Sequence, residues 1–68
     1  MDFEMSTPLH AARALSVLTA VGYSSTTANR RQGAEELIVV SVSASTEHGV
    51  TEAQRLINAV DPAARPLN

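Results

Sequence analysis

The spacing of apolar residues changes from segment to segment along this chain, and each spacing predicts a different element. Residues 1 to 5 alternate one by one, with Met1, Phe3 and Met5 on one side and acidic residues on the other. A period of two is the pattern of a half-buried strand. We therefore predict a short strand over residues 1–5.

A helix is predicted between residues 8 and 22, where apolar positions recur every three or four residues and so share one helical face. These positions are Ala11, Ala14, Leu15, Leu18 and Val21. Ser6 or Thr7 supplies a side-chain oxygen for the free N–H groups of the first turn, and Pro8 fits that turn because it needs no N–H partner. Gly22 ends the helix, since glycine readily adopts the left-handed conformation of a helix C-cap.

Two strands joined by a hairpin are predicted next. Residues 23–29 favour β structure but are polar, as in an edge strand. Residues 29–33 contain Asn and Gly and form the predicted hairpin turn. The return strand spans residues 35–45, and because its first half is apolar on both faces, we predict that it is the central strand.

The parity of the return strand divides its side chains between two faces. Ile38, Val40 and Val42 share one face, and Leu37 and Val39 share the other. Serines follow on the second face, at positions 41, 43 and 45. If helices cover the first face, Leu37 and Val39 are expected to lie uncovered.

A second helix is predicted from residue 51 to residue 61, after a loop over residues 46–49. Thr51 and Gln54 have the spacing of a capping box, in which each side chain satisfies a backbone donor at the helix start. The apolar positions of this helix again share one face. They are Ala53, Leu56, Ile57 and Val60. Asp61-Pro62 ends the helix, because a residue that precedes proline is disfavoured in the helical conformation.

Together these elements predict one α+β domain over residues 1–62 and an extended C-terminal tail over residues 63–68. With a right-handed first crossover, the order strand, helix, strand, strand, helix gives a three-stranded sheet of strand order 1-3-2, with both helices on one face. This βαββα arrangement resembles a ferredoxin-like fold that lacks its last strand. Unrelated proteins share that topology, so it implies no function.

Composition predicts a thin aliphatic core and a non-membrane protein. The 68 residues include one Phe, one Tyr, no Trp and no Cys, so disulfides and thiolate metal sites are excluded and self-association is the expected compensation. The longest uncharged apolar run, over residues 37–42, is too short to span a bilayer. The acidic start is unlike a signal peptide, so we expect a cytoplasmic protein. Abundant Ala and Arg without Lys indicate a GC-rich bacterial or phage genome.

Candidate catalytic groups are few. His10 and His48 are the side chains whose ordinary pKa lies near neutral pH, but they are far apart in the sequence. There is no Gly-x-Ser-x-Gly nucleophile motif and no phosphate-binding glycine loop, and the many Ser and Thr residues fit the solvent side of a sheet. The pair Glu47-His48 alone defines no metal geometry. We therefore expect a non-catalytic protein without a cofactor.

The one concentrated positive feature is the pair Arg30 and Arg31, at the predicted hairpin tip. Arginine is suited to the bidentate capture of carboxylates and phosphates, so a small anionic-ligand sensor is an alternative function. The net charge of −2 and the scattered arginines disfavour nucleic-acid binding, which remains a second alternative. A solvated hairpin tip, neutralised by the neighbouring acidic residues 35 and 36, requires neither function.

Leu37 and Val39 are the residues that most affect the functional prediction. Exposed aliphatics in the centre of a sheet suggest a contact surface, although scattered aliphatics on a small protein require no partner. We predict a small protein-interaction or regulatory module that forms a homodimer, or binds a larger protein, through the open sheet face or an edge strand. Its predicted partner-binding residues are Leu37, Val39, Arg30 and Arg31.

Overall fold

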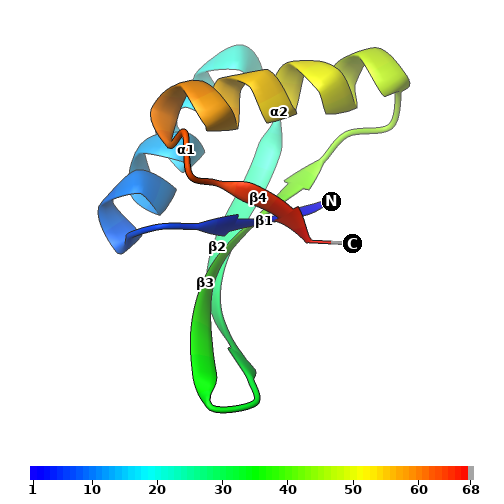
Figure 1. Ribbon diagram of the computed structural model, residues 1–68. Coiled ribbons are helices and arrows are strands. Elements are labelled where there is room, and N and C mark those ends of the chain that lie inside the picture. The colour runs from blue at the N-terminus through cyan, green and yellow to red at the C-terminus, as the bar shows by residue number, and fades with distance from the viewer. Residues whose placement is uncertain (68) are drawn as a thin grey trace.

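The computed structural model describes residues 1–67 and confirms a small α+β fold, with two helices and a four-stranded antiparallel sheet (Figure 1). In chain order the elements are β1 (Asp2–Met5), α1 (Pro8–Val21), β2 (Ser24–Gln32), β3 (Glu35–Ser43), α2 (Glu47–Val60) and β4 (Arg65–Leu67). The strand order in the sheet is β2-β3-β1-β4. β3 therefore has a strand on either side, as predicted for the central strand.

β4 is the element that the sequence did not predict. Within the segment expected to be a tail, Arg65–Leu67 pairs with β1, and Pro66 lies opposite Phe3. Asn68 lies outside the described residues. The three predicted strands are neighbours in the predicted order, but the sheet has a fourth strand, so the three-stranded arrangement was wrong. β4 was missed because it has only three residues and a central proline, which fits an edge strand but carries no strand signal of its own.

α1 begins and ends where the sequence predicts. The Thr7 hydroxyl accepts a hydrogen bond from the His10 N–H at 3.1 Å, and Pro8 occupies the first turn. Gly22 ends the helix with a φ of 102°, a left-handed conformation that its missing Cβ permits.

α2 begins five residues earlier than predicted. Thr46, and not Thr51, is its N-cap, and the Thr46 hydroxyl accepts a hydrogen bond from the Gly49 N–H at 3.0 Å. Gly49, which was expected in a loop, is buried in the first turn beside Tyr23. A Cβ at Gly49 would lie 3.2 Å from the Thr46 hydroxyl oxygen, which is a tight contact. The small residue thus lets the helix begin against Tyr23, a contact that the local sequence does not indicate.

The hairpin between β2 and β3 is longer than predicted, and its turn is tighter. β2 continues to Gln32, which pairs with Glu35, so the loop is only Gly33-Ala34. Gly33 has a φ of 62° and Ala34 has no positive φ, as in the type II′ turns that match the twist of a hairpin. The hairpin extends past β1 and away from the helices (Figure 1). Residues 30 and 31 therefore lie within β2, and the predicted position at the turn was wrong.

The core lies between the two helices and one face of the sheet, and the strands that contribute to it are β1 and β3. Its buried cluster consists of Phe3, Met5, Ala11, Ala14, Leu18, Val40, Val42, Ala53, Ile57 and Ala64. Val40 and Val42 belong to this cluster and Ile38 packs against it, as predicted for the face of β3 under the helices. Within residues 1–67, neither helix is long and apolar enough to cross a membrane.

Candidate interaction surface

β2 forms one edge of the sheet, and no other strand of residues 1–67 lies along its outer side. Eight of its nine residues are exposed, and Ser25 is half-buried. The strand pairs with β3 in unbroken register, from Ser24 opposite Ser43 to Gln32 opposite Glu35. An edge strand of this length, without proline or bulge, presents a row of unpaired backbone N–H and C=O groups.

The hydrogen bonds of Val42 establish which backbone groups of β2 face outward. The Val42 N–H donates to the Met1 carbonyl at 2.8 Å, and the Met1 nitrogen donates to the Val42 carbonyl at 2.9 Å. Both backbone groups of Val42 therefore point toward β1. Ser25 lies opposite Val42 in β3, and because Val42 bonds to β1, Ser25 and Val42 form a non-hydrogen-bonded pair. The backbone N–H and C=O groups of Ser25 therefore point away from β3, toward the free edge. The outward residues of β2 are Ser25, Thr27, Asn29 and Arg31.

β4 forms the opposite edge of the sheet, and it is poorly suited to pairing with another strand. β4 has only three residues, and its central residue, Pro66, has no N–H group to offer. Short edge strands, prolines and charged side chains are the features by which proteins prevent unwanted pairing at sheet edges. β4 has all three, with Arg65 as the charged residue, whereas β2 is long and uncharged from residue 24 to residue 29.

Leu37 and Val39 lie on the sheet face opposite the helices, but they are not uncovered as the sequence suggested. Leu37 is 7% exposed and Val39 is 2% exposed. Arg30 on β2 donates to the Asp2 carboxylate on β1 at 2.9 Å, and β3 lies between these two strands. The arginine side chain must therefore cross β3 on this face, from its position opposite Leu37 toward Asp2. The expectation of an exposed aliphatic patch was wrong because a long side chain from a neighbouring strand covers it.

Two ion pairs with carboxylates of β1 lie on this face of the sheet, opposite the helices. Asp2 accepts hydrogen bonds from Arg30 and, at 2.7 Å, from the Ser41 hydroxyl, and these two bonds hold the pKa of Asp2 below its usual value. Glu4 accepts a hydrogen bond from Arg65 on β4, and this bond raises the pKa of Arg65. The open face of the sheet is therefore polar and internally paired.

The four predicted partner-binding residues do not form one free surface. Leu37 and Val39 are buried, and Arg30 is paired with Asp2. Arg31 is exposed, but its position next to Arg30 in the strand places its side chain on the other face of the hairpin. Partner binding by these four residues stays a prediction.

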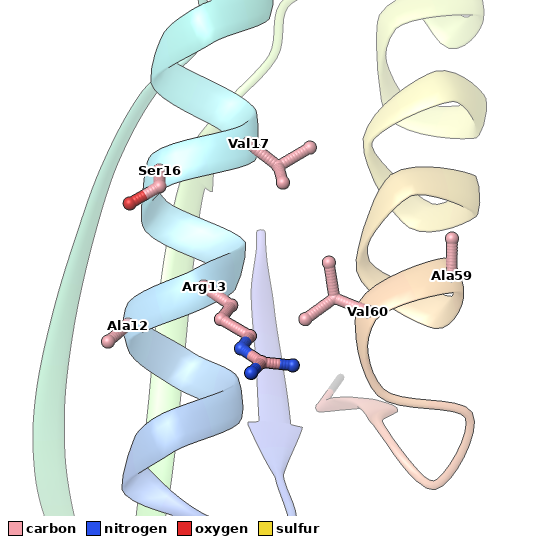
Figure 2. A pocket seen from close by; sticks show the side chains of 6 residues that line it. All are labelled: Ala12, Arg13, Ser16, Val17, Ala59 and Val60. Carbon is pink, nitrogen blue, oxygen red and sulfur yellow. The ribbon is translucent and has the colours of Figure 1, made fainter.

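A shallow groove of about 430 Å³ separates the outer sides of α1 and α2 (Figure 2). In Figure 2, Val17 from α1 and Val60 from α2 point toward each other across the groove, and the Arg13 side chain reaches over it. No sequence pattern identified this groove, because it depends on how the two helices pack together. Its lining offers small apolar side chains, the Ser16 hydroxyl and one cation, Arg13, with no feature that specifies an occupant.

Asp61 is the one buried charged residue among residues 1–67, with 1% of its surface exposed. Its Oδ2 accepts hydrogen bonds from the Ser6 N–H and the Ser6 hydroxyl, both at 2.8 Å, and its Oδ1 accepts one from the Ala63 N–H at 3.0 Å. Burial by itself raises the pKa of Asp61, but these hydrogen bonds and the nearby His10 outweigh burial and hold the pKa below its usual value. Asp61 thus ties the start of α1 to the end of α2.

Ser6, His10 and Asp61 are the residue types of a hydrolytic triad, but their spatial order differs. In a triad the histidine stands between the serine and the carboxylate. Here the Ser6 hydroxyl is 2.8 Å from Asp61 Oδ2 and 3.1 Å from His10 Nδ1, and the Thr7 hydroxyl lies 2.8 Å from the same nitrogen. His48 is in the first turn of α2, roughly 18 Å along the axis from the helix end near His10. Within residues 1–67, no three His, Asp or Glu side chains are placed to hold a metal ion.

Comparisons of the chain with protein-family models, with curated proteins and with solved structures found no match. A functional assignment therefore depends on the geometry of the chain itself. Its most distinctive geometric features are the long open edge at β2 and the internally paired sheet face beside it.

Proposed function

We propose that this chain is a small non-catalytic protein-interaction module that binds an extended segment of a partner along the free edge of β2. The observation that carries the proposal is the nine-residue edge strand, which is exposed at eight of its nine residues and paired in unbroken register on its inner side only. A strand added at such an edge gains backbone hydrogen bonds with every second residue. The buried Leu37 and Val39 argue against the open sheet face as the binding surface.

We also propose that the fold has a ferredoxin-like topology. The element order βαββαβ and the sheet order β2-β3-β1-β4 support this. In such a sheet, β2 and β4 are the two edges, and β4 is too short to serve a long partner strand. The topology itself carries no function.

The two alternatives from the sequence have less support. An anion sensor that uses both arginines needs them on one surface, but Arg30 is paired with Asp2, and Arg31 lies on the other face of the hairpin, with the acidic Glu36 opposite it. Nucleic-acid binding needs a clustered positive surface, and the same acidic neighbours reduce the local charge. We therefore do not extend the proposal to either function.

The test uses a displayed library of short random peptides, selected for binding to the full chain. The variant Thr27→Pro removes one outward N–H group without removing a hydrogen bond between β2 and β3, since Thr27 does not donate to β3. The matched control, Thr27→Val, changes the same side chain and keeps the N–H group. Selected peptides should bind wild type and Thr27→Val equally, and Thr27→Pro at least about tenfold more weakly, which corresponds to about 1.4 kcal/mol.

Amide chemical shifts locate the bound peptide. Strand addition should shift the amides of Ser25, Thr27, Asn29 and Arg31 more than those of residues 12–17. Peptides that bind Thr27→Pro as tightly as wild type, or that shift the groove between α1 and α2 instead, would contradict the proposal. So would a selection that yields no binder.

A further inference from the structure

We infer that the segment bound at the β2 edge is β2 of a second copy of this chain, paired antiparallel about a twofold axis at Ala28. This inference rests on the proposed function, because it names the occupant of the same edge. Three observations support it: the direction of the backbone groups, the placement of charge along the strand and the contrast between the two sheet edges.

The outward backbone groups fix the register. Pairing two antiparallel copies about Ala28 places Ser25 opposite the partner's Arg31 and Thr27 opposite the partner's Asn29. All four outward residues of each copy then form hydrogen-bonded pairs, each of which exchanges two N–H···O bonds. Moving the axis by one residue leaves one outward residue outside the paired strands, and moving it to Thr26 leaves two outside. The Ala28 axis therefore gives the most complete pairing.

The same register separates like charges. The charges of β2 lie in one half of the strand, at Arg30 and Arg31, and the other half is uncharged. Antiparallel pairing about Ala28 sets the charged half of each copy against the uncharged half of the other, so that Arg30 lies opposite the partner's Thr26. The Cα atoms of the two Arg30 residues are then roughly 13 Å apart along the strands, and each Arg30 side chain reaches away from the shared edge, toward Asp2 of its own copy. Moving the axis to Arg30 would instead place arginine directly opposite arginine.

The two sheet edges also favour self-pairing at β2. A long, uninterrupted edge with an uncharged half promotes association between identical chains, and proteins normally protect such edges. β4 has this protection in the form of Pro66, Arg65 and its short length, whereas β2 has no proline and no bulge. A second copy brings an edge of the same length, whose uncharged half can face the arginines of this one.

The decisive experiment uses the fact that the chain has no cysteine. Ala28 lies on the inferred twofold axis, where the facing Cα atoms of a non-hydrogen-bonded pair are about 4.5 Å apart, within disulfide range. Ala28→Cys should therefore form a disulfide-linked dimer under mild oxidation. Thr26→Cys is the matched control: both residues are exposed on the same face of β2, but two Cys side chains at position 26 would be roughly 13 Å apart.

The second measurement is sedimentation equilibrium on the wild type, Thr27→Val and Thr27→Pro, from micromolar to millimolar concentration. Wild type and Thr27→Val should dimerise, and Thr27→Pro should remain monomeric with an unchanged helical circular-dichroism signal. Ala28→Cys cross-linking at least tenfold faster than Thr26→Cys would support the register, and equal rates would overturn it. A wild type that is monomeric at millimolar concentration would overturn self-pairing.

The two proposals fail in different ways. A monomeric wild type whose selected peptides still require the Thr27 N–H group would leave the edge as a binding site and assign it to a different chain. A monomeric wild type whose selected peptides are indifferent to Thr27→Pro would overturn both the inference and the proposed function.

Discussion

Replacing Asp61 by asparagine should test how the two helices are held together. Asp61 accepts two hydrogen bonds from Ser6 through Oδ2 and one from Ala63 through Oδ1. An amide has only one acceptor oxygen. In Asp61→Asn, whichever way the side chain turns, its NH2 group faces either the Ser6 donors or the Ala63 N–H, and at least one backbone donor loses its partner.

The expected loss follows from these contacts. Hydrogen bonds to a charged group contribute about 1.5–3 kcal/mol each, and a buried donor left without a partner costs about 1–3 kcal/mol. Removing a buried charge offsets part of the loss, because the neutral amide is less costly to bury. We expect Asp61→Asn to lower the free energy of unfolding by about 2 kcal/mol. A domain of this size has roughly 3–10 kcal/mol in total, so the loss is a large fraction of its stability.

The assay is urea unfolding followed by circular dichroism, at a series of pH values. The pKa of Asp61 is lower in the folded chain than the ordinary aspartate value of 3.8, so its contribution to stability is fully present above that value. The contribution is lost as the pH falls through the folded pKa. The difference between wild type and Asp61→Asn should therefore be present at neutral pH and shrink below about pH 4. Equal stability at neutral pH, or a difference that persists in strong acid, would refute the assigned role.

Two further predictions concern Tyr23 and Gly33. The Tyr23 hydroxyl donates to Glu52 at 2.6 Å, and this bond, with burial, raises the pKa of Tyr23 above 10.0. An ultraviolet titration of the single tyrosine should have its midpoint above that value, and Glu52→Gln should lower the midpoint; no change would contradict the contact. Gly33 has a φ of 62°, and a Cβ there would meet no atom within 4 Å, so Gly33→Ala should cost about 1 kcal/mol of unfolding free energy through backbone strain alone. The control Ala34→Ser should have little effect, and equal urea midpoints for both variants would show that the turn is not strained.

Some parts of the candidate site could be predicted from the sequence. The polar composition of residues 23–29 identified an edge strand, and the parity of β3 assigned Val40 and Val42 to the helix-covered face. What the sequence missed was the state of the other face. Leu37 and Val39 are buried because Arg30 reaches across β3 to Asp2, and these two residues are 28 positions apart in the chain. No local sequence pattern predicts this contact between Arg30 and Asp2.

The sequence alone determined the features that depend on a few neighbouring residues. These are the alternation of β1, the Thr7 cap and Gly22 end of α1, and the two-faced apolar run of β3, because propensity, capping and periodicity act within one or two turns. Only the tertiary structure decided the pairing of β4, the early start of α2 against Tyr23, and the contact of Ser6 with Asp61 across 55 positions. Each of these joins groups that are distant in the sequence, and such contacts form only when the packed core brings the groups together.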